Sequence, residues 1–116
     1  MLSSVAEVQQ LIDHNSVTFL QPDVPRVGGI TPFLKIMAQA EQRRLKLAPH
    51  FVMELHIHMS AAYQHETWVE HIEWLEPAFN ERLEIKEGCM ILPTTPGIGF
   101  SLSDEATRWR AAYERV

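Results

Sequence analysis

Three titratable residues, Asp23, His50 and Glu70, each stand where a short apolar stretch of the chain stops. In proteins built on parallel strands, the carboxyl ends of the strands meet at one edge, where catalytic residues usually lie. A carboxylate beside an imidazole fixes the orientation and the tautomer of the ring. These residue types indicate a general acid/base pair, Asp23 with His50, and a Glu70 that can polarise or hydrogen-bond a substrate oxygen.

The elements that must position these residues alternate between helix and strand. β-Branched, aromatic or continuous apolar runs predict the strands, and apolar residues at helical spacing predict the helices. Thr31 is the predicted N-cap of the second helix, because Pro32 after it is favoured at the first helical position. Such alternation implies a parallel sheet or a barrel segment, with the three residues at one end. The predicted order is helix 5–13, strand 17–20, helix 32–45, strand 46–50, helix 53–63 and strand 68–70.

The C-terminal part of the chain shows a different pattern. Residues 71–80 predict a loop with a helical turn. Glu87-Gly88 separates two strand-like runs and predicts a hairpin, with Gly88 at the position that needs a positive φ. Ser103 is the predicted N-cap of a last helix. The predicted elements are strands 83–86 and 90–92, a Pro/Gly-rich connection 93–99 and a helix 105–113.

Length and composition limit the class of protein. The chain has 116 residues, 46% hydrophobic and 22% charged, which is enough for one folded domain with a modest core. It is too short for a complete (β/α)8 barrel, which takes roughly 250 residues. The net charge is −5, and the densest basic run, Arg43-Arg44 with Lys46, falls in the last turn of a predicted helix, so nothing in the sequence supports a nucleic-acid surface. The single cysteine, Cys89, excludes an intrachain disulfide.

The sequence shows no sign of membrane insertion. Its apolar runs are shorter than the roughly 18 residues of a membrane span. The first residues lack the basic start and apolar core of a signal peptide. We therefore expect a cytoplasmic protein without a membrane partner.

The chain has six histidines, among them His56 and His58, so a metal site is an alternative to the acid/base pair. Residues two apart on a helix point in different directions, so this pair would not chelate one ion. A structural role is favoured for these histidines, and no set of metal ligands is predicted within the chain.

Four motifs of the chain carry a resemblance to a known family: Asp23-Val24-Pro25-Arg26-Val27-Gly28-Gly29-Ile30-Thr31, Pro49-His50, Trp68-Val69-Glu70 and Pro96-Gly97-Ile98-Gly99. Together they resemble the C-terminal part of the mandelate racemase and muconate lactonizing enzyme group of the enolase superfamily. The interval from Asp23 to His50 and the interval from His50 to Glu70 both fit that group. The segment 47–63 is most similar to its acid-sugar dehydratases, in particular those acting on galactarate and L-talarate.

The resemblance implies an α/β fold, namely a partial TIM-type (β/α) barrel made of the last three β/α units, strands six to eight. Residues 1–80 would belong to the barrel, and residues 81–116 would form a tail that packs on a capping domain. The resemblance also implies roles for the site residues. His50, in a dyad with Asp23, would remove the proton α to a carboxylate, Glu70 would stabilise the enediolate, and loss of water would complete the dehydration of an acid sugar.

The same resemblance implies a Mg2+ ion that this chain cannot hold by itself. In the family its three acidic ligands lie on strands three to five, and a Lys-x-Lys pair lies on strand two; none of these strands is present. The chain would then be a truncated piece that starts at an internal Met. Because an enediolate needs a metal or an equivalent positive charge, we expect the isolated chain to be inactive.

Two further functions stay open at this point. A racemase or epimerase of the same superfamily would use the same dyad, and a non-catalytic fragment would have only a structural role. A partial barrel leaves sheet edges unpaired, so we also expect homo-oligomers or association through those edges.

Overall fold

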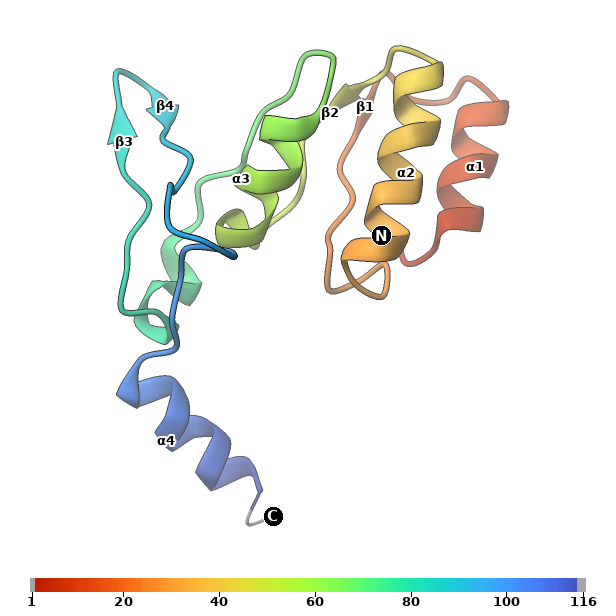
Figure 1. Ribbon diagram of the computed structural model, residues 1–116. Helices are drawn as coiled ribbons and strands as arrows, with labels where there is room; N and C mark the ends of the chain where they lie inside the picture. Colours follow the sequence, from red (N-terminus) through yellow and green to blue (C-terminus); the bar gives the residue numbers. More distant parts are fainter. Residues whose placement is uncertain (1, 115–116) are drawn as a thin grey trace. The chain divides into compact units, whose positions relative to one another are not determined.

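The computed structural model describes residues 2–114 and divides the chain into two units (Figure 1). The first unit runs to His71 and the second begins at Ile72. The functional division predicted from the sequence, between a barrel part up to residue 80 and a tail after it, stays a prediction.

The first unit alternates helix and strand, as the sequence predicts. The helices α1 and α2 pack against each other (Figure 1). The core is formed by Val8, Ile12, Leu20, Val24, Val27, Phe33, Ile36, Met37, Ala40, Leu47 and Tyr63. The elements are α1 (Val5–Asp13), β1 (Phe19–Leu20), α2 (Ile30–Gln42), β2 (Lys46–Leu47) and α3 (Met53–Ala62).

Helix α1 has the predicted limits because local signals at both ends set them. The Ser4 hydroxyl accepts a hydrogen bond from the Glu7 N–H at 3.2 Å, which satisfies one of the unpaired amides of the first turn. At the other end Asn15 has a φ of +49°. Its amide donates to Ile12 and the Ser16 amide donates to Leu11, which together form a Schellman motif.

Helix α2 begins two residues earlier than predicted. Its N-cap is Gly29, not Thr31, and no side chain caps the helix. Gly29 has a φ of +114°, a conformation in which a side chain would be strained. The Gly29 amide donates to Val24, and its carbonyl accepts from Phe33, so the preceding turn sets the start of the helix. Pro32 is tolerated in the first turn because its missing N–H would have no helical partner there.

The two strands of the first unit are parallel and very short. Phe19 pairs with Lys46 and Leu20 with Leu47, so the offset along the chain is the same for both pairs. Pro22 is fully buried and lacks the N–H with which the first segment would continue the ladder. The pairing nevertheless extends past the strands, because the His50 amide donates to the Pro22 carbonyl at 3.0 Å.

The predicted strand over 68–70 is wrong as a regular strand. Only Thr67 pairs, in an isolated parallel bridge to Leu47. The Trp68 amide donates to Leu47 at 2.9 Å. The next donor on the facing chain would be Pro49, which has no N–H, and this explains why the ladder stops there.

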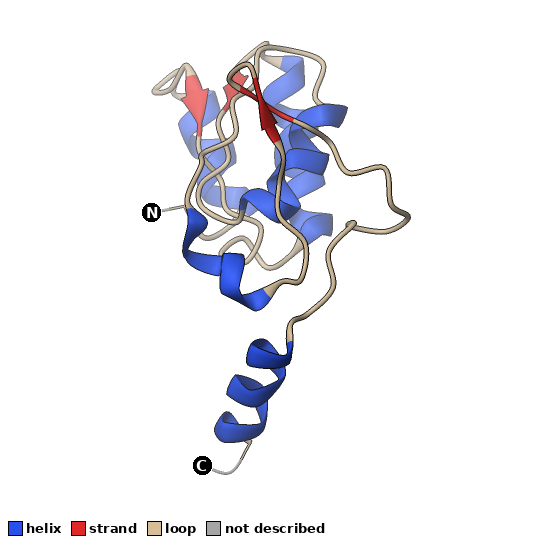
Figure 2. Ribbon diagram, turned by 90° about the vertical axis from the view of Figure 1, so that its left-hand side faces the viewer, coloured by secondary structure: helices blue, strands red, loops and turns tan. Residues whose placement is uncertain are grey.

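The second unit contains short elements and exposed side chains. Figure 2 shows that strands, in red, are a small part of the chain. The predicted hairpin and last helix are present, and Ser103 caps that helix by accepting from the Ala106 amide at 3.1 Å. Glu87 and Gly88 both have positive φ at the hairpin turn. The elements are the 3-10 helix η1 (Glu73–Ala78), the antiparallel strands β3 (Ile85–Lys86) and β4 (Cys89–Met90), and α4 (Asp104–Tyr113).

No helix between residues 2 and 114 is both long enough and apolar enough to cross a membrane.

Candidate active site

The first unit brings Asp23, His50 and Glu70 together, and the strand register explains why. The interval from Asp23 to His50 equals the offset between the paired residues of β1 and β2. The interval from His50 to Glu70 equals the offset of the Leu47–Thr67 bridge. Parallel pairing therefore carries each residue to the same level as the next, three residues beyond the last regular pair.

Asp23 and His50 form the predicted contact. The Nδ1 atom of His50 lies 3.3 Å from Oδ2 of Asp23. Asp23 is buried, whereas the His50 side chain is 42% exposed. A proton on Nδ1 is the one that Asp23 can accept, so the neutral ring keeps the Nε2 lone pair on its open side. The pair is thus oriented as a general base whose second nitrogen faces outward.

Arg26 is a third member of this group that the sequence analysis assigned no role. Its Nε atom lies 3.2 Å from the same Oδ2 of Asp23 that His50 contacts. Amides of Arg26 and Val27 also donate to the Asp23 carbonyl, so a tight turn brings the guanidinium back to the carboxylate. Two donors therefore hold one oxygen of Asp23, and this fixes the position of the carboxylate. The signal in the sequence that could have identified Arg26 is its spacing of three residues from Asp23.

Glu70 is positioned by a backbone amide. The Phe51 N–H donates to Oε2 of Glu70 at 2.7 Å, and the same oxygen lies 4.0 Å from Nε2 of His50. This geometry places the carboxyl group of Glu70 on the open side of the imidazole. It leaves Oε1 as the oxygen of Glu70 that can face a substrate.

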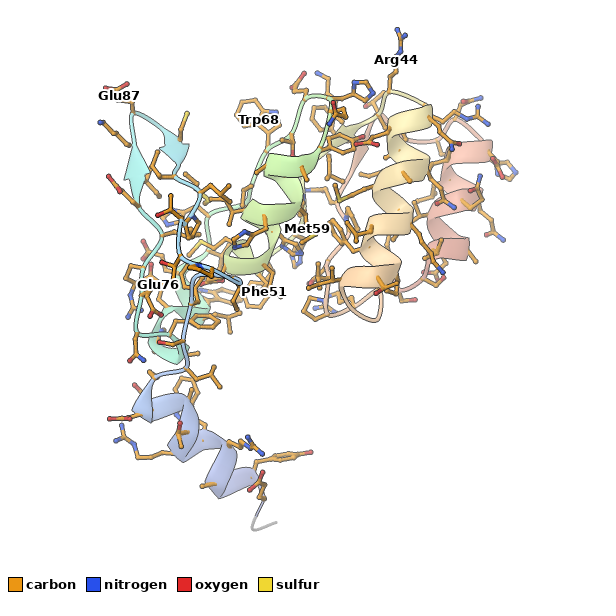
Figure 3. All side chains as sticks on the ribbon, in the orientation of Figure 1. Arg44, Phe51, Met59, Trp68, Glu76 and Glu87 are labelled. Atoms are coloured by element: carbon orange, nitrogen blue, oxygen red, sulfur yellow. The ribbon has the colours of Figure 1, made fainter. Side chains whose placement is uncertain are left out.

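Phe51 adopts a conformation that is unusual for an aromatic residue. Its φ is +73°, in the left-handed region that a side chain normally avoids. Figure 3 shows Phe51 at the end of α3 where that helix begins. The conformation turns the Phe51 amide toward Glu70 directly after the base, and strain of this kind is common where side chains must be oriented for function. Sequence reasoning missed Phe51 because nothing in its residue type predicts a positive φ.

A cavity of about 310 Å³ opens beside the pair. This volume is at the lower end of the range for small-molecule sites. Asp23, Arg26 and His50 form its charged or titratable part. The other lining residues are Leu2, Leu11, Val17, Phe19, Leu20 and Gln21.

His56 contacts the site from behind. Its Nε2 accepts a hydrogen bond from the Val24 amide at 3.0 Å, and its ring stacks on Phe33 with 5.4 Å between centroids. His56 is therefore held in the core by contacts within the protein, in keeping with the structural role favoured from the sequence.

The fold and the site together define the class of the protein. Residues 1–106 match the family described as enolase C-terminal domain-like, and the chain belongs to this family. Its fold is accordingly the α/β fold of that TIM-barrel-type family.

Individual relatives show which enzymes of the family this chain is similar to. The chain is 57% identical over 109 residues to the L-talarate/galactarate dehydratase of Salmonella typhimurium, covering 94% of this chain and 27% of that protein. It is 32% identical to the 3,6-anhydro-alpha-L-galactonate cycloisomerase of Streptomyces coelicolor, covering 90% of this chain and 29% of that protein. The crystal structure of L-talarate dehydratase from a Polaromonas species, complexed with Mg and L-glucarate, superposes with a TM-score of 0.92 at 60% identity. That match covers 94% of this chain and 30% of the crystallised one.

The chain thus spans less than a third of the length of these relatives. The ligands and activities named for these relatives belong to their whole chains. The corresponding activity of this chain is therefore a proposal.

Mg2+ is present in two structures of related dehydratases, but the residues around the dyad do not fit it. Mg2+ prefers an octahedral set of oxygen ligands. Oδ2 of Asp23 already faces Arg26 and His50, and Oε2 of Glu70 faces the Phe51 amide. A guanidinium and an imidazole beside these carboxylates leave no cation site in the dyad.

Proposed function

We propose that this chain supplies the general base of an acid-sugar dehydratase and forms strands six to eight of its (β/α) barrel. The observation that carries the proposal is the Asp23–His50 contact, which leaves Nε2 of His50 on the open side of the ring. The identity of 57% to an L-talarate/galactarate dehydratase supports an aldarate, a sugar with a carboxylate at each end, as the substrate.

His50 is the base in this proposal. Its Nε2 takes the proton on the carbon next to a substrate carboxylate, and Asp23 holds the resulting imidazolium through Nδ1. The electron pair left on carbon forms the enediolate and then expels the β-hydroxyl, which leaves as water with a proton that the imidazolium can return. The enol product tautomerises to a 2-oxo acid, so the overall reaction is loss of one water without a change of redox state.

Glu70 acts on the carboxylate oxygen where charge develops. With Oε2 held by the Phe51 amide, Oε1 is the atom that approaches the substrate. To donate a hydrogen bond to the enediolate, Glu70 must carry a proton there, and the donor then stabilises the developing charge.

A hybrid enzyme tests the role of His50. This chain replaces the matching 27% of the Salmonella dehydratase, and Mg2+-dependent turnover of galactarate and L-talarate is measured. His50→Asn, which cannot act as a base, is expected to lower kcat by about 10²–10⁴-fold, the usual cost of losing a general base.

The matched control is His14→Asn, since His14 is the exposed C-cap residue of α1 and its ring contacts the Gln10 carbonyl in the helix before it. Its turnover should equal that of the unsubstituted hybrid. An undiminished rate in the His50→Asn hybrid would remove the proposal.

Isomerisation is the second candidate function, because the Asp23–His50 pair can return a proton to the α-carbon of the substrate before the substrate loses water. The relative from Streptomyces coelicolor, named a cycloisomerase, favours keeping this candidate. Solvent deuterium that enters the substrate at the α-carbon, without release of a 2-oxo acid, would support it over dehydration.

The chain by itself is expected to be inactive. The dyad supplies a base but no cation site, and an enediolate needs strong positive charge to form at a useful rate. The assay is turnover of galactarate by the purified 116-residue chain with and without Mg2+. Measurable Mg2+-dependent turnover would contradict the expectation.

We also propose that copies of this chain associate through unpaired strand edges. β1 pairs with β2 on one side, and within residues 2–114 its other edge carries no partner strand. Unpaired edges favour pairing with another chain, so light scattering should show a species larger than 13.3 kDa. A strictly monomeric chain at high concentration would argue against this part.

A further inference from the structure

His56 is a buried titratable residue that has no role in the proposed reaction steps. It lies on α3, is 0% exposed, and is 32 residues away in sequence from the amide that it binds. That amide belongs to Val24, the residue directly after Asp23. The contact therefore joins α3 to the segment that carries the carboxylate of the dyad.

The hydrogen bond defines the tautomer of His56. The Val24 N–H is the donor, so Nε2 of His56 must be the acceptor and cannot carry a proton. Burial lowers the pKa of His56 to about 4, because a charged ring would lose its hydration; the charge of His50 acts in the same direction, and those of Asp23 and Glu70 oppose it. At neutral pH the ring is uncharged, with its proton on Nδ1.

Helix α3 is thereby connected to both halves of the dyad. The chain enters the helix through His50 and Phe51, and His56 lies one turn inside it. The imidazole is held between the Val24 amide and the ring of Phe33 on α2. A displacement of the Val24 segment would move the Asp23 carboxylate, whose position decides the orientation of His50.

We propose that His56 is a positioning residue: its neutral imidazole holds the Asp23–Val24 segment, so that Asp23 meets Nδ1 of the base. This inference rests on the proposed function, in which Asp23 and His50 act as a dyad. His56 does not touch the substrate, because it is fully buried and its Nε2 is occupied.

The first arm of the test needs no activity. Long-range proton–nitrogen NMR on the full 116-residue chain, with His56→Gln to assign the signals, reports which nitrogen carries the proton. The expected result is an Nδ1–H ring that stays neutral down to about pH 5, following its pKa of about 4. An Nε2–H ring, or one that titrates near the usual 6.5, would overturn the proposal whatever the enzyme assay shows.

The second arm compares two substitutions in the hybrid enzyme. His56→Leu removes the acceptor, and we expect kcat to fall by about 10- to 100-fold with KM within about twofold, as for other lost orienting contacts. His56→Gln places an amide oxygen near the position of Nε2 and should restore kcat to within about threefold of the unsubstituted hybrid. Equal rates for His56→Leu and His56→Gln, or a loss confined to KM, would overturn the proposal.

His65→Leu is the matched control. His65 is part-buried and, like His56, contacts a backbone group, here the Glu41 carbonyl at 3.2 Å, but it lies outside the dyad. Its kcat should be unchanged. If His50→Asn were fully active while the NMR result held, the dehydratase proposal would fail separately and the hydrogen bond of His56 would remain established.

Discussion

The two units of the chain are stabilised in different ways. The first unit has a core of fully buried apolar residues, among them Phe33, Ile36 and Leu47. In the second unit none of residues 72–114 is buried, and large apolar side chains such as Trp74 and Leu102 are mostly exposed. Local hydrogen bonds support it instead, for example those from Ser101 to the Glu81 carboxylate.

The difference separates the part that holds the site from the part that does not. The dyad, Arg26, Glu70 and His56 all belong to the first unit, where burial fixes side-chain positions. Exposed hydrogen bonds contribute little net stability, because water competes for the same groups. We therefore expect the second unit to unfold at lower cost than the first, and matched substitutions can test this.

The largest expected difference comes from one change made in both units. Phe33→Ala removes a ring that is 0% exposed and should lower the free energy of unfolding of the first unit by about 3–5 kcal/mol. Phe79→Ala removes a half-buried ring whose contact with Phe100 is worth about 0.5–1.5 kcal/mol. Urea unfolding followed by NMR, with amides of each unit read separately, measures both values.

Phe33→Leu serves as the control, since a smaller cavity should cost less than the alanine change. Equal losses from Phe33→Ala and Phe79→Ala would show that the two units do not differ in the way their burial indicates.

Acid should affect the two units in different pH ranges. The pKa of His56 is lowered by burial to about 4, so between pH 6.5 and 4 the unfolded chain binds a proton that the folded chain does not. The first unit therefore loses stability as the pH falls through this range, by up to about 1.4 kcal/mol per pH unit from this group. Asp23, His50 and Glu70 face His56 and modify the value. Denaturant midpoints at several pH values provide the measurement.

The second unit should respond at lower pH. Hydrogen bonds from Ser101 lower the pKa of Glu81 from 4.5, so its contribution is present above 4.5 and is lost as the pH falls through the folded value. His56→Gln, which cannot titrate, should flatten the profile of the first unit between pH 6.5 and 4. A slope that persists in this variant would assign the effect to another group.

Some features of the fold could be predicted from the sequence because their causes are local. The limits of α1 follow from Ser4 and Asn15, which lie at its ends. The meeting of Asp23 with His50 was predicted because both residues follow parallel strands, and the structure gives those strands a register equal to the interval between the two residues. In each case residues near in sequence, or a regular offset, carry the information.

Other features depend on contacts between distant residues. The predicted strand at 68–70 is missing because the facing residue on another segment, Pro49, has no N–H to donate to it. The amide of Phe51 reaches Glu70 across 19 residues. Such contacts exist only once the chain has folded, so residue type alone could not reveal them.

Helix caps provide a smaller test of the same comparison. Ser4→Ala and Ser103→Ala each remove a cap worth about 1 kcal/mol. Helix α1 is anchored by buried Val8 and Ile12 and should stay helical, whereas α4 has no buried residue and should lose most of its helicity. Carbon-13 secondary shifts of both helices report this. Ser103→Thr keeps the hydroxyl and should retain α4; a helical α4 in Ser103→Ala would contradict the expectation.

The smallest expected effects come from two residues with the same strained backbone. Arg44 and Glu87 both have a φ of +52°, and Figure 3 shows Arg44 at the end of α2 and Glu87 at the tip of the hairpin. Glycine relieves the strain at either site but adds freedom to the unfolded chain, so the net gain should stay below about 1 kcal/mol. Because the first unit unfolds as one core, Arg44→Gly should raise protection of its amides together, including that of Ala48.

Glu87→Gly should slow hydrogen exchange only within the hairpin, as at the Ile91 amide, which donates to Glu84 at 2.8 Å. The reason is that no buried side chain among residues 72–114 transmits a local gain to the other elements of the second unit. Exchange rates measured by NMR for both variants and the unsubstituted chain decide the matter. If Glu87→Gly protected α4 as much as the hairpin, the second unit would be cooperative, and exposure would be a poor guide to how this part of the chain is held together.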